Sequence, residues 1–449
     1  MRLKFYIPKM NSMSRISCHT ALYLASVFIF FSLALPVFSE VPEDIIPPCF
    51  TGSEFNKVRE WEKTWVGKKV NFTIVDQVKD LLPEPLVQII KEPTKWGGND
   101  IWFEVVPYRY CAPSRGLLAA TKRYSPLAKF DPNGFKTTWG EVGSNEFLVG
   151  YDKGELAGFP FPKPKTGIEM AWNYDSITNG DNHKKSMLGD LVNCATGVER
   201  RSHHAMNYMY WTGRTDVPPL PKIEPNPPGL RRTLLMDMLE PADMYGSKTL
   251  ELQYTDPRKE KDSYMWLAMF RKIRRMSTSQ RGDSFGGGDL SHADGEGYED
   301  QVNRNSYKFL GVKDMLACRH QEGSKLVRQK GQGVYCGQQR ERCKLHLVEV
   351  VDKDKGYIYS KEIWYLDRET WRILYKLCWD REGKLWRFLD SQMGIQNSVR
   401  GDPVSFLVGY TYVDVQKIHG TPTIHKDSVL GIELSPDIFT VDYLQKTGY

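Results

Sequence analysis

The segment "KLHLVEVVDKDKGYIYSKEIWYLDRETWRILYKLCWDREGKLWRFLD" (residues 344–390) carries the strand pattern that decides the fold. Apolar and aromatic residues alternate with polar ones in four runs, and the first three runs end at an aspartate. The intervening motifs are DKDKG (352–356), DRET (367–370) and DREG (380–383), and Asp and Gly are typical of tight turns. The segment therefore predicts an antiparallel meander of strands.

The same alternation continues outside the meander. It occurs in "LLMDMLEP" (234–241) and "YMWLAMFRK" (264–272), and the chain holds 12 tryptophans and 12% aromatic residues. Helical pattern is mainly confined to the first third, for example in "VDQVKDLL" (75–82) before Pro83. These observations predict a β-rich α+β fold with a large antiparallel sheet.

The N-terminal segment has the layout of an export signal. Four basic residues (Arg2, Lys4, Lys9 and Arg15) precede an almost unbroken apolar run at 21–38, which ends at Ser39. This order predicts a signal peptide at 1–39 that is cleaved near Ser39, and an uncleaved membrane anchor is the alternative. The segment contains four of the 61 basic residues and none of the 55 acidic ones, so the mature chain has a net charge near +2. Such a balance does not favour a nucleic-acid-binding protein.

A proline-rich stretch, "DVPPLPKIEPNPPGL" (216–230), interrupts the strand pattern. Six prolines in fifteen residues cannot continue a sheet ladder, so the stretch is predicted to be a stiff, extended connection. It is either a domain boundary or a long loop within one sheet. We predict a single domain at 40–449 that contains this stretch as a loop.

Seven cysteines follow the signal segment, and none forms a C-x-x-C pair: Cys49, Cys111, Cys194, Cys318, Cys336, Cys343 and Cys378. Export permits disulfides, and the clustering of Cys318, Cys336 and Cys343 favours one local bridge over a metal site. Because the number is odd, at least one thiol stays free or pairs between chains. We predict no metal and no cofactor.

The loop "RRMSTSQRGDSFGGGDL" (274–290) offers residues with possible catalytic or metal-binding roles. Ser284 and His292 resemble parts of a Gly-Asp-Ser esterase, but they lie too close together in the sequence for that family. The glycines lack the Lys-Ser/Thr of a phosphate-binding loop. Calcium is a further alternative, yet a solvated loop is favoured over a calcium site for the acidic residues at 289–300: Asp289, Asp294, Glu296, Glu299 and Asp300. The neighbouring His203 and His204 point to opposite faces of a strand, so they make a poor pair of ligands.

Alternating Met, Trp and Leu residues form either an ordinary core or the wall of an apolar cavity. Methionine side chains, here Met236, Met238, Met265 and Met269, are flexible and suit a lipid of variable shape. In the run 264–272, Trp266 and Phe270 share one face of the expected strand, and Met265 and Met269 share the other. We predict that the cavity is lined by Met236, Met238, Trp266, Phe270 and Trp364.

Three blocks of the chain resemble a known family. They are "MWLAMFRKIRRMSTSQRGDSFGGGDLSHAD" (265–294), "GELAGFPFPKPKTGIEMAWNYD" (154–175) and "GYIYSKEIWYLDRETWRILYKLCWDREGKLWRF" (356–388). These blocks resemble the domain of unknown function 1329 family, which is described as outer-membrane lipoprotein-sorting-like. Along the chain they occur in the same order as in that family. The "Y-x-P" expected after Trp266 is replaced here by "LAMF".

The resemblance implies a curved sheet that forms a half-open barrel, with helices covering the opening and a lipid or acyl chain on the concave side. It implies a periplasmic protein, either free in the periplasm or associated with the outer membrane, that serves envelope lipid or lipoprotein transport. It also implies as partners a resistance-nodulation-division-type exporter and an outer-membrane protein. The alternatives are an exported hydrolase with Ser284 and His292, and a non-catalytic structural subunit of an exporter.

Overall fold

The structure, a computed structural model, describes residues 45–448. They belong to one compact unit. The predicted signal peptide at 1–39 lies outside the described residues, so it stays a prediction. Within residues 45–448, no helix is both long enough and apolar enough to cross a membrane.

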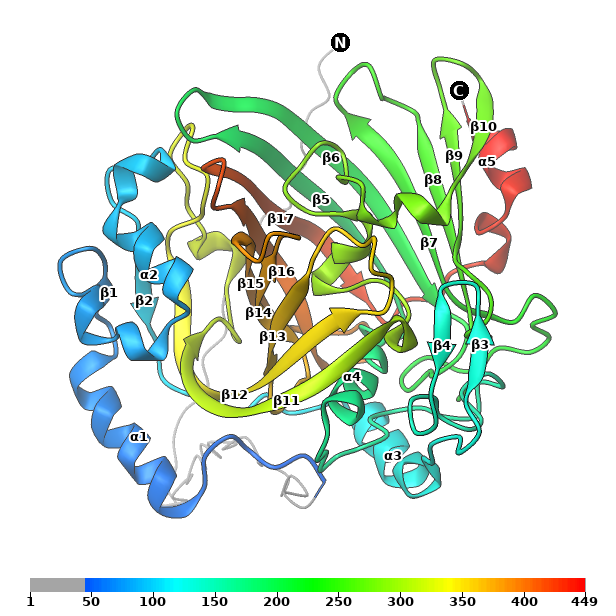
Figure 1. The fold of residues 1–449 in the computed structure, drawn as a ribbon, viewed down its shortest axis with the longest axis horizontal. Helices are drawn as coiled ribbons and strands as arrows, with labels where there is room; N and C mark the ends of the chain where they lie inside the picture. Colours follow the sequence, from blue (N-terminus) through cyan, green and yellow to red (C-terminus); the bar gives the residue numbers. More distant parts are fainter. Residues whose placement is uncertain (1–44, 449) are drawn as a thin grey trace, which may run out of the picture. The chain divides into compact units, whose positions relative to one another are not determined.

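One open sheet of fifteen strands dominates the described chain (Figure 1). Its strands pair antiparallel except for β2 and β12, which run parallel. The predicted fold class, a β-rich α+β fold on a large antiparallel sheet that does not close, is confirmed. In sheet order the strands are β1 (Lys69–Val70), β2 (Phe103–Val105), β12 (Gln338–Asp352), β13 (Lys361–Asp367), β14 (Ile373–Trp379), β15 (Leu385–Asn397), β16 (Pro403–Asp414), β17 (His419–Leu430), β5 (Asn182–Asn193), β6 (Gly197–Tyr210), β7 (Leu230–Glu240), β8 (Lys248–Tyr254), β9 (Asp262–Leu267) and β10 (Lys272–Met276), with β11 (Asn305–Ala317) paired to β12; β3 (Phe135–Thr137) and β4 (Gly140–Val142) form a separate hairpin.

The predicted meander at 344–390 is confirmed, because β12, β13, β14 and β15 pair in succession. Its turns use the aspartates as the sequence indicates. Asp352 Oδ1 accepts a hydrogen bond from the Asp354 amide at 2.7 Å, and Asp380 Oδ1 accepts one from the Lys384 amide at 2.8 Å. These side chains replace backbone partners that the turning chain lacks.

The prediction that the run 264–272 is one strand is wrong. The run contains the end of β9, a turn and the start of β10. Lys272 pairs with Leu267, so the chain reverses at residues 268–271. Arg271 takes a positive φ of 49° in this turn. Phe270 therefore lies at the tip of a hairpin, where it is 63% exposed.

Three of the five described α-helices lie in the first third of the chain, where the sequence predicts most of the helical pattern. The segment 75–82, which the sequence predicts to be helical, is not one α-helix. It forms two short 3-10 helices, Val75–Gln77 and Lys79–Leu81, because Val78 between them has a φ of −128°. At the C-terminal end, one helix packs against β8, β9 and β10. The α-helices are α1 (Gly52–Trp65), α2 (Glu84–Lys91), α3 (Arg115–Tyr124), α4 (Gly167–Asp175) and α5 (Val441–Thr447).

The proline-rich segment at 216–230 connects β6 and β7, which pair directly, so it is a loop within the sheet. The buried Arg214 holds its start by donating hydrogen bonds to the carbonyls of Val217 and Pro219. Asp181 accepts hydrogen bonds from the amides of Thr215 and Val217. The segment is thus fixed by buried polar contacts, which compensate for the ladder bonds that proline cannot make.

All seven described cysteines are buried free thiols, so the expected bridge among Cys318, Cys336 and Cys343 is wrong. The three sulfur atoms lie in different environments. Cys343 Sγ contacts the Met315 carbonyl at 3.7 Å, whereas Cys336 Sγ lies 2.9 Å from Gln332 Nε2. Proximity in the sequence does not bring these thiols together.

Candidate functional site

A cavity of about 210 Å³ lies between one face of strands β6 to β10 and the loop at 277–304. Its apolar wall contains five methionines and one phenylalanine: Met236, Met238, Met244, Met265, Met276 and Phe285. A larger hollow of about 600 Å³ lies at the edge formed by β8 to β10, but charged residues such as Lys259, Glu260 and Arg275 line it. The 210 Å³ cavity is therefore the better site for an apolar molecule.

Strand register explains the methionine wall. Met236 on β7 lies opposite Met206 on β6 and opposite Thr249 on β8, which in turn lies opposite Met265 on β9. Since side chains alternate between the two faces of a strand, these residues form one row across the sheet. Thr249, Met236 and Met265 of this row line the cavity.

The opposite face of the same strands is a filled core. Leu235, Leu250 and Trp266 form a buried cluster there with Phe439 and Leu444 of the C-terminal segment. Because this segment includes α5, the helix covers that face and leaves the methionine face to the cavity.

The loop at 277–304 forms the wall that faces the methionines, and buried ion pairs hold it. Glu296 pairs with Lys185 of β5, and Asp294 pairs with Lys376 of β14. The remaining acidic residues are engaged in the same way: Asp289 with His419 at 2.7 Å, Glu299 with Arg232 at 2.9 Å, and Asp300 with Arg304 at 2.9 Å. The acidic stretch at 289–300 is thus not the solvated loop that the sequence favours, and its carboxylates are committed to basic partners rather than gathered as calcium ligands.

The charged residues around the cavity form ion pairs with one another or with close neighbours. Lys261 lies 2.9 Å from Glu251, and Arg281 lies 3.4 Å from Asp300 and 2.8 Å from Asp352. Three cationic and three anionic residues line the cavity, so the charges of the lining cancel: Lys261, Arg281, Arg304, Glu251, Glu299 and Asp300.

Two neutral polar residues of the lining have unpaired buried atoms. His204 Nδ1 and Thr249 Oγ1 are buried and have no hydrogen-bond partner among the described residues. Burial lowers the pKa of His204 to about 4, helped by the neighbouring His203, and burial also lowers the pKa of His292. His204 is therefore neutral near pH 7.

The structure brings together two of the five residues predicted to line the cavity. Met236 and Met238 line it. Trp266 lies behind the sheet against the α5 side, and Phe270 lies in the exposed turn. Trp364 is fully buried in the main core, where Tyr298 packs on its ring at 4.9 Å. Ligand binding by these residues stays a prediction, but three of them lie away from this cavity.

Sequence reasoning missed Met244, Met276, His204 and Thr249. The predicted alternation within β9 agrees with the structure, in which Met265 lines this cavity and Trp266 lies on the opposite face. The available signal was the methionine content itself, because Met recurs on one face of β7, β9 and β10.

The hydrolase residues do not form a catalytic pair. Ser284 Oγ donates a hydrogen bond to the Gly288 carbonyl at 2.6 Å, within the same turn. His292 lines the cavity, and its ring lies edge-on to Phe285 at 5.4 Å. Among the described contacts of Ser284, none joins it to an imidazole, so the general-base contact of a serine hydrolase is missing.

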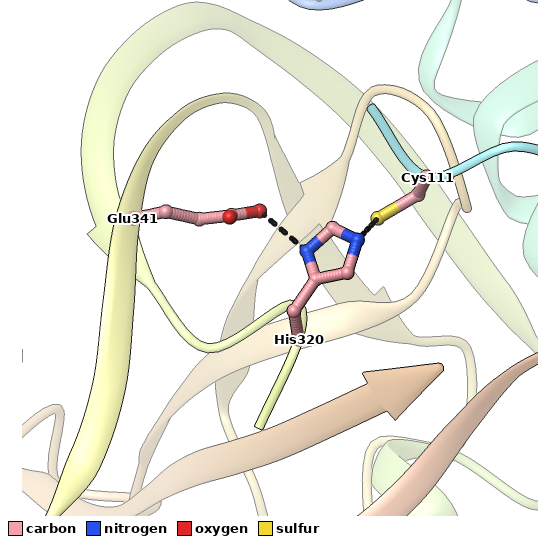
Figure 2. Close-up of side chains that lie close together, drawn as sticks. All are labelled: Cys111, His320 and Glu341. Carbon is pink, nitrogen blue, oxygen red and sulfur yellow. Dashed lines mark hydrogen bonds and ion pairs between the residues drawn. The ribbon is translucent and has the colours of Figure 1, made fainter. Parts of the chain in front are cut away.

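A second cluster of reactive side chains lies away from this cavity (Figure 2). His320 Nε2 is 3.8 Å from Cys111 Sγ, and His320 Nδ1 is 3.0 Å from Glu341 Oε1. Glu341 is fully buried and also accepts a hydrogen bond from Arg319 at 3.1 Å. Burial raises the pKa of the Cys111 thiol well above its usual value.

Within residues 45–448, this cluster is the one group of His, Cys and acidic side chains close enough to hold a metal ion. Figure 2 shows the imidazole ring between the sulfur and the carboxylate, which face different ring nitrogens. An ion bound at Nε2 would have two protein ligands, Cys111 and His320, whereas a structural zinc site uses four and a catalytic one three. The residues therefore do not complete a zinc site.

The comparisons with known proteins concern family and fold. A family model described as "Protein of unknown function (DUF1329)" matches residues 70–445. No curated protein matches the chain.

Several solved structures are similar. A DUF1329 family protein from Desulfovibrio piger ATCC 29098 is 16% identical, with a TM-score of 0.46, over 62% of this chain and 96% of that one. An outer membrane lipoprotein-sorting protein domain from Vibrio parahaemolyticus is 16% identical, with a TM-score of 0.45, over 62% and 98% of the two chains. A LolA superfamily protein from Nitrosomonas europaea is 11% identical, with a TM-score of 0.41, over 62% and 100%.

Proposed function

The chain belongs to the DUF1329 family of proteins of unknown function, and from its methionine-lined cavity we propose that it is a carrier of a hydrophobic molecule. The single observation that carries this proposal is the apolar cavity of about 210 Å³ between β6–β10 and the 277–304 loop. Methionine side chains adapt to ligands of different shape, which suits a carrier better than a site for one rigid substrate.

The size of the cavity sets the scale of binding. At about 30 Å³ for each water molecule, 210 Å³ corresponds to roughly seven waters. A chain of roughly seven methylenes has a similar volume and gains about 6 kcal/mol at about 0.8 kcal/mol for each group, before ordering costs. This free energy supports capture and still permits release.

The proposed place of action is the bacterial envelope. Support comes from the predicted signal peptide at 1–39 and from the family resemblance. A carrier in the periplasm would deliver its ligand to a membrane protein, and the exporter and outer-membrane partners named by the resemblance belong to this proposal.

The test compares two Met→Arg variants. Met236 is 2% exposed and lines the cavity, whereas Met269 is 71% exposed in the β9–β10 turn. We expect organic extracts of the natively purified protein to contain a hydrophobic molecule that is lost in Met236→Arg and kept in Met269→Arg. Mass spectrometry of the extracts measures this, and circular dichroism checks the fold. Equal ligand content in the two folded variants would place the ligand elsewhere.

The Cys111 cluster favours a second candidate function, a thiol-dependent reaction. With Glu341 as acceptor, His320 Nδ1 carries the proton, so Nε2 presents its lone pair to Cys111 Sγ. A thiol beside a base that a carboxylate orients is the arrangement of cysteine nucleophiles. Because burial raises the pKa of Cys111, the resting thiol is protonated, and attack requires transfer of its proton to His320 Nε2. Cys111 also lines a small cavity of about 50 Å³.

Alkylation distinguishes this second function from a purely structural role. We expect limited iodoacetamide treatment of the folded protein to modify Cys111 first if the thiol is active. The other six described cysteines, which are also buried, serve as internal controls. His320→Gln should then slow the modification of Cys111 alone. Equal and slow modification of all seven thiols contradicts a thiol-dependent function.

A further inference from the structure

The lining of the 210 Å³ cavity limits the charge of its ligand. The cationic groups Lys261, Arg281 and Arg304 each have a carboxylate within 3.4 Å. A carboxylate or phosphate head group would have to compete with these existing partners. A cationic head group would face the same obstacle at Glu251 and Glu299. The cavity therefore offers no uncompensated charge to a charged ligand.

The polar atoms without partners are neutral ones. His204 on β6 lies opposite Met238 of β7, and Thr249 on β8 lies opposite Met236 of β7. The two polar residues thus flank the methionine strand on either side. His204 is 4% exposed and Thr249 is 5% exposed. A buried hydroxyl and a buried ring nitrogen without partners are costly, because water no longer satisfies them.

We propose that the ligand is an uncharged amphiphile whose apolar chain lies on the methionines and whose neutral polar groups (hydroxyl, carbonyl or amide) hydrogen-bond to Thr249 and to His204. This inference rests on the carrier function proposed above and adds the chemical class of the ligand. Neutral hydrogen-bonding groups satisfy the two buried polar residues without separating any ion pair.

The chemistry of His204 agrees with this ligand class. Burial holds its pKa near 4, so at pH 7 the ring is neutral and contributes one donor and one acceptor. Its ring also lies 5.9 Å from that of Phe285, which keeps it on the cavity wall beside the 277–304 loop. Thr249 adds a hydroxyl that both donates and accepts.

The experiment compares twelve-carbon probes that differ in the head group; roughly seven methylenes fill the cavity, and the rest of the chain extends toward the open hollow that shares Met276 and Ser277 with it. Displacement of the neutral fluorophore N-phenyl-1-naphthylamine is measured at pH 8.5 with 1-dodecanol, dodecanoate and dodecyltrimethylammonium. We expect dodecanol to bind at least about a hundredfold more tightly than either ion, because an unpaired charge loses several kcal/mol on burial. Equal or tighter binding of dodecanoate overturns the inference and leaves the carrier function standing. Failure of the fluorophore and of every probe to bind overturns the carrier function as well.

Two substitutions of Thr249 form a matched pair. Thr249→Val keeps the shape and removes the hydroxyl, and we expect it to weaken dodecanol binding about threefold to tenfold. Thr249→Ser keeps the hydroxyl and should bind dodecanol like the wild type. His204→Phe, which keeps a ring beside Phe285, is the second test. Because His204 and Thr249 lie on either side of β7, the single hydroxyl of dodecanol reaches one of them, and the variant of that residue should show the loss. Unchanged dodecanol affinity in folded Thr249→Val and His204→Phe variants overturns the inference.

Discussion

The Asp294–Lys376 pair predicts how firmly the 277–304 loop is held against the sheet. Asp294 Oδ1 pairs with Lys376 Nζ, while Oδ2 accepts hydrogen bonds from the Ser291 amide at 2.7 Å and the Tyr359 hydroxyl at 2.7 Å. The side chains of Asp294 and Lys376 are 1% and 0% exposed. Asp294→Asn keeps the shape of the side chain but leaves the buried ammonium of Lys376 with Glu362, 3.5 Å away, as its remaining carboxylate.

The size of the effect follows from burial. Removing one partner of a buried ion pair costs about 3–5 kcal/mol, and the remaining Glu362 contact places this variant near 3 kcal/mol. The entropy of unfolding is about 2.1 cal/mol/K per residue, so roughly 400 described residues give about 0.85 kcal/mol/K. We therefore expect the melting temperature to fall by about 3–4 °C.

Differential scanning calorimetry of the wild type and of Asp294→Asn measures this change. The matched control is Glu382→Gln, which breaks the exposed Lys384–Glu382 pair at 2.9 Å. Both of its side chains are at least 70% exposed, and we expect its melting temperature to stay within about 1 °C of the wild type. If Asp294→Asn also melts within about 1 °C of the wild type, the loop is not held by this pair, and the argument that it forms a fixed cavity wall fails.

Three further predictions concern Ser284, His419 and the seven described cysteines. Ser284→Ala removes only a local hydrogen bond to Gly288, so the ligand content of its extracts, measured by mass spectrometry, should equal that of the wild type. Loss of the ligand in a folded Ser284→Ala variant would restore the hydrolase alternative. The hydrogen bond to Asp289 raises the pKa of His419, so this pair stabilises the fold fully below about pH 6.5 and less as the pH rises through the folded pKa. His419→Gln should therefore lower the melting temperature more at pH 6 than at pH 9. An equal loss at both pH values contradicts the pairing. Ellman's reagent should detect seven thiols in the unfolded mature protein without reductant, and a lower count would show a disulfide.

The strands of the meander could be predicted because their signals are local. Alternation within β13 and β14 and the aspartates at 352 and 380 act over a few residues, and the structure uses them as the sequence indicates. The hairpin at 264–272 was missed for a related reason. The turn residues 268–271 contain no Gly, Pro, Asn or Asp, so the reversal carries no turn signal in the sequence.

The choice of the cavity face could not be predicted from the strands alone. Alternation in β9 separates Met265 from Trp266, but it does not say which of the two faces is covered. Leu444 of α5 decides this, because it packs with Trp266 more than 170 residues further along the chain. The sequence therefore separates the two faces of β9, and the structure places this cavity on the Met265 face.

The burial and ion pairing of the acidic loop could not be predicted from the sequence, because its partners are also distant in the chain. Asp294 and Glu296 have the composition of a solvated loop, and their partners Lys376 and Lys185 lie 82 and 111 residues away. Only the curved sheet brings these groups together. The charges of these residues can be read from the sequence, but their burial and their partners cannot.

The two walls of the cavity differ in stiffness, and this difference bears on how a ligand reaches it. Buried ion pairs such as Glu296–Lys185 fix the loop wall, whereas the methionine wall is built of flexible side chains. We therefore expect variation in ligand shape to be taken up by the sheet side. Met276 and Ser277 line both the cavity and the open hollow at the β9–β10 edge. A ligand that passes this edge displaces methionine side chains without separating a buried ion pair, which is the less costly route.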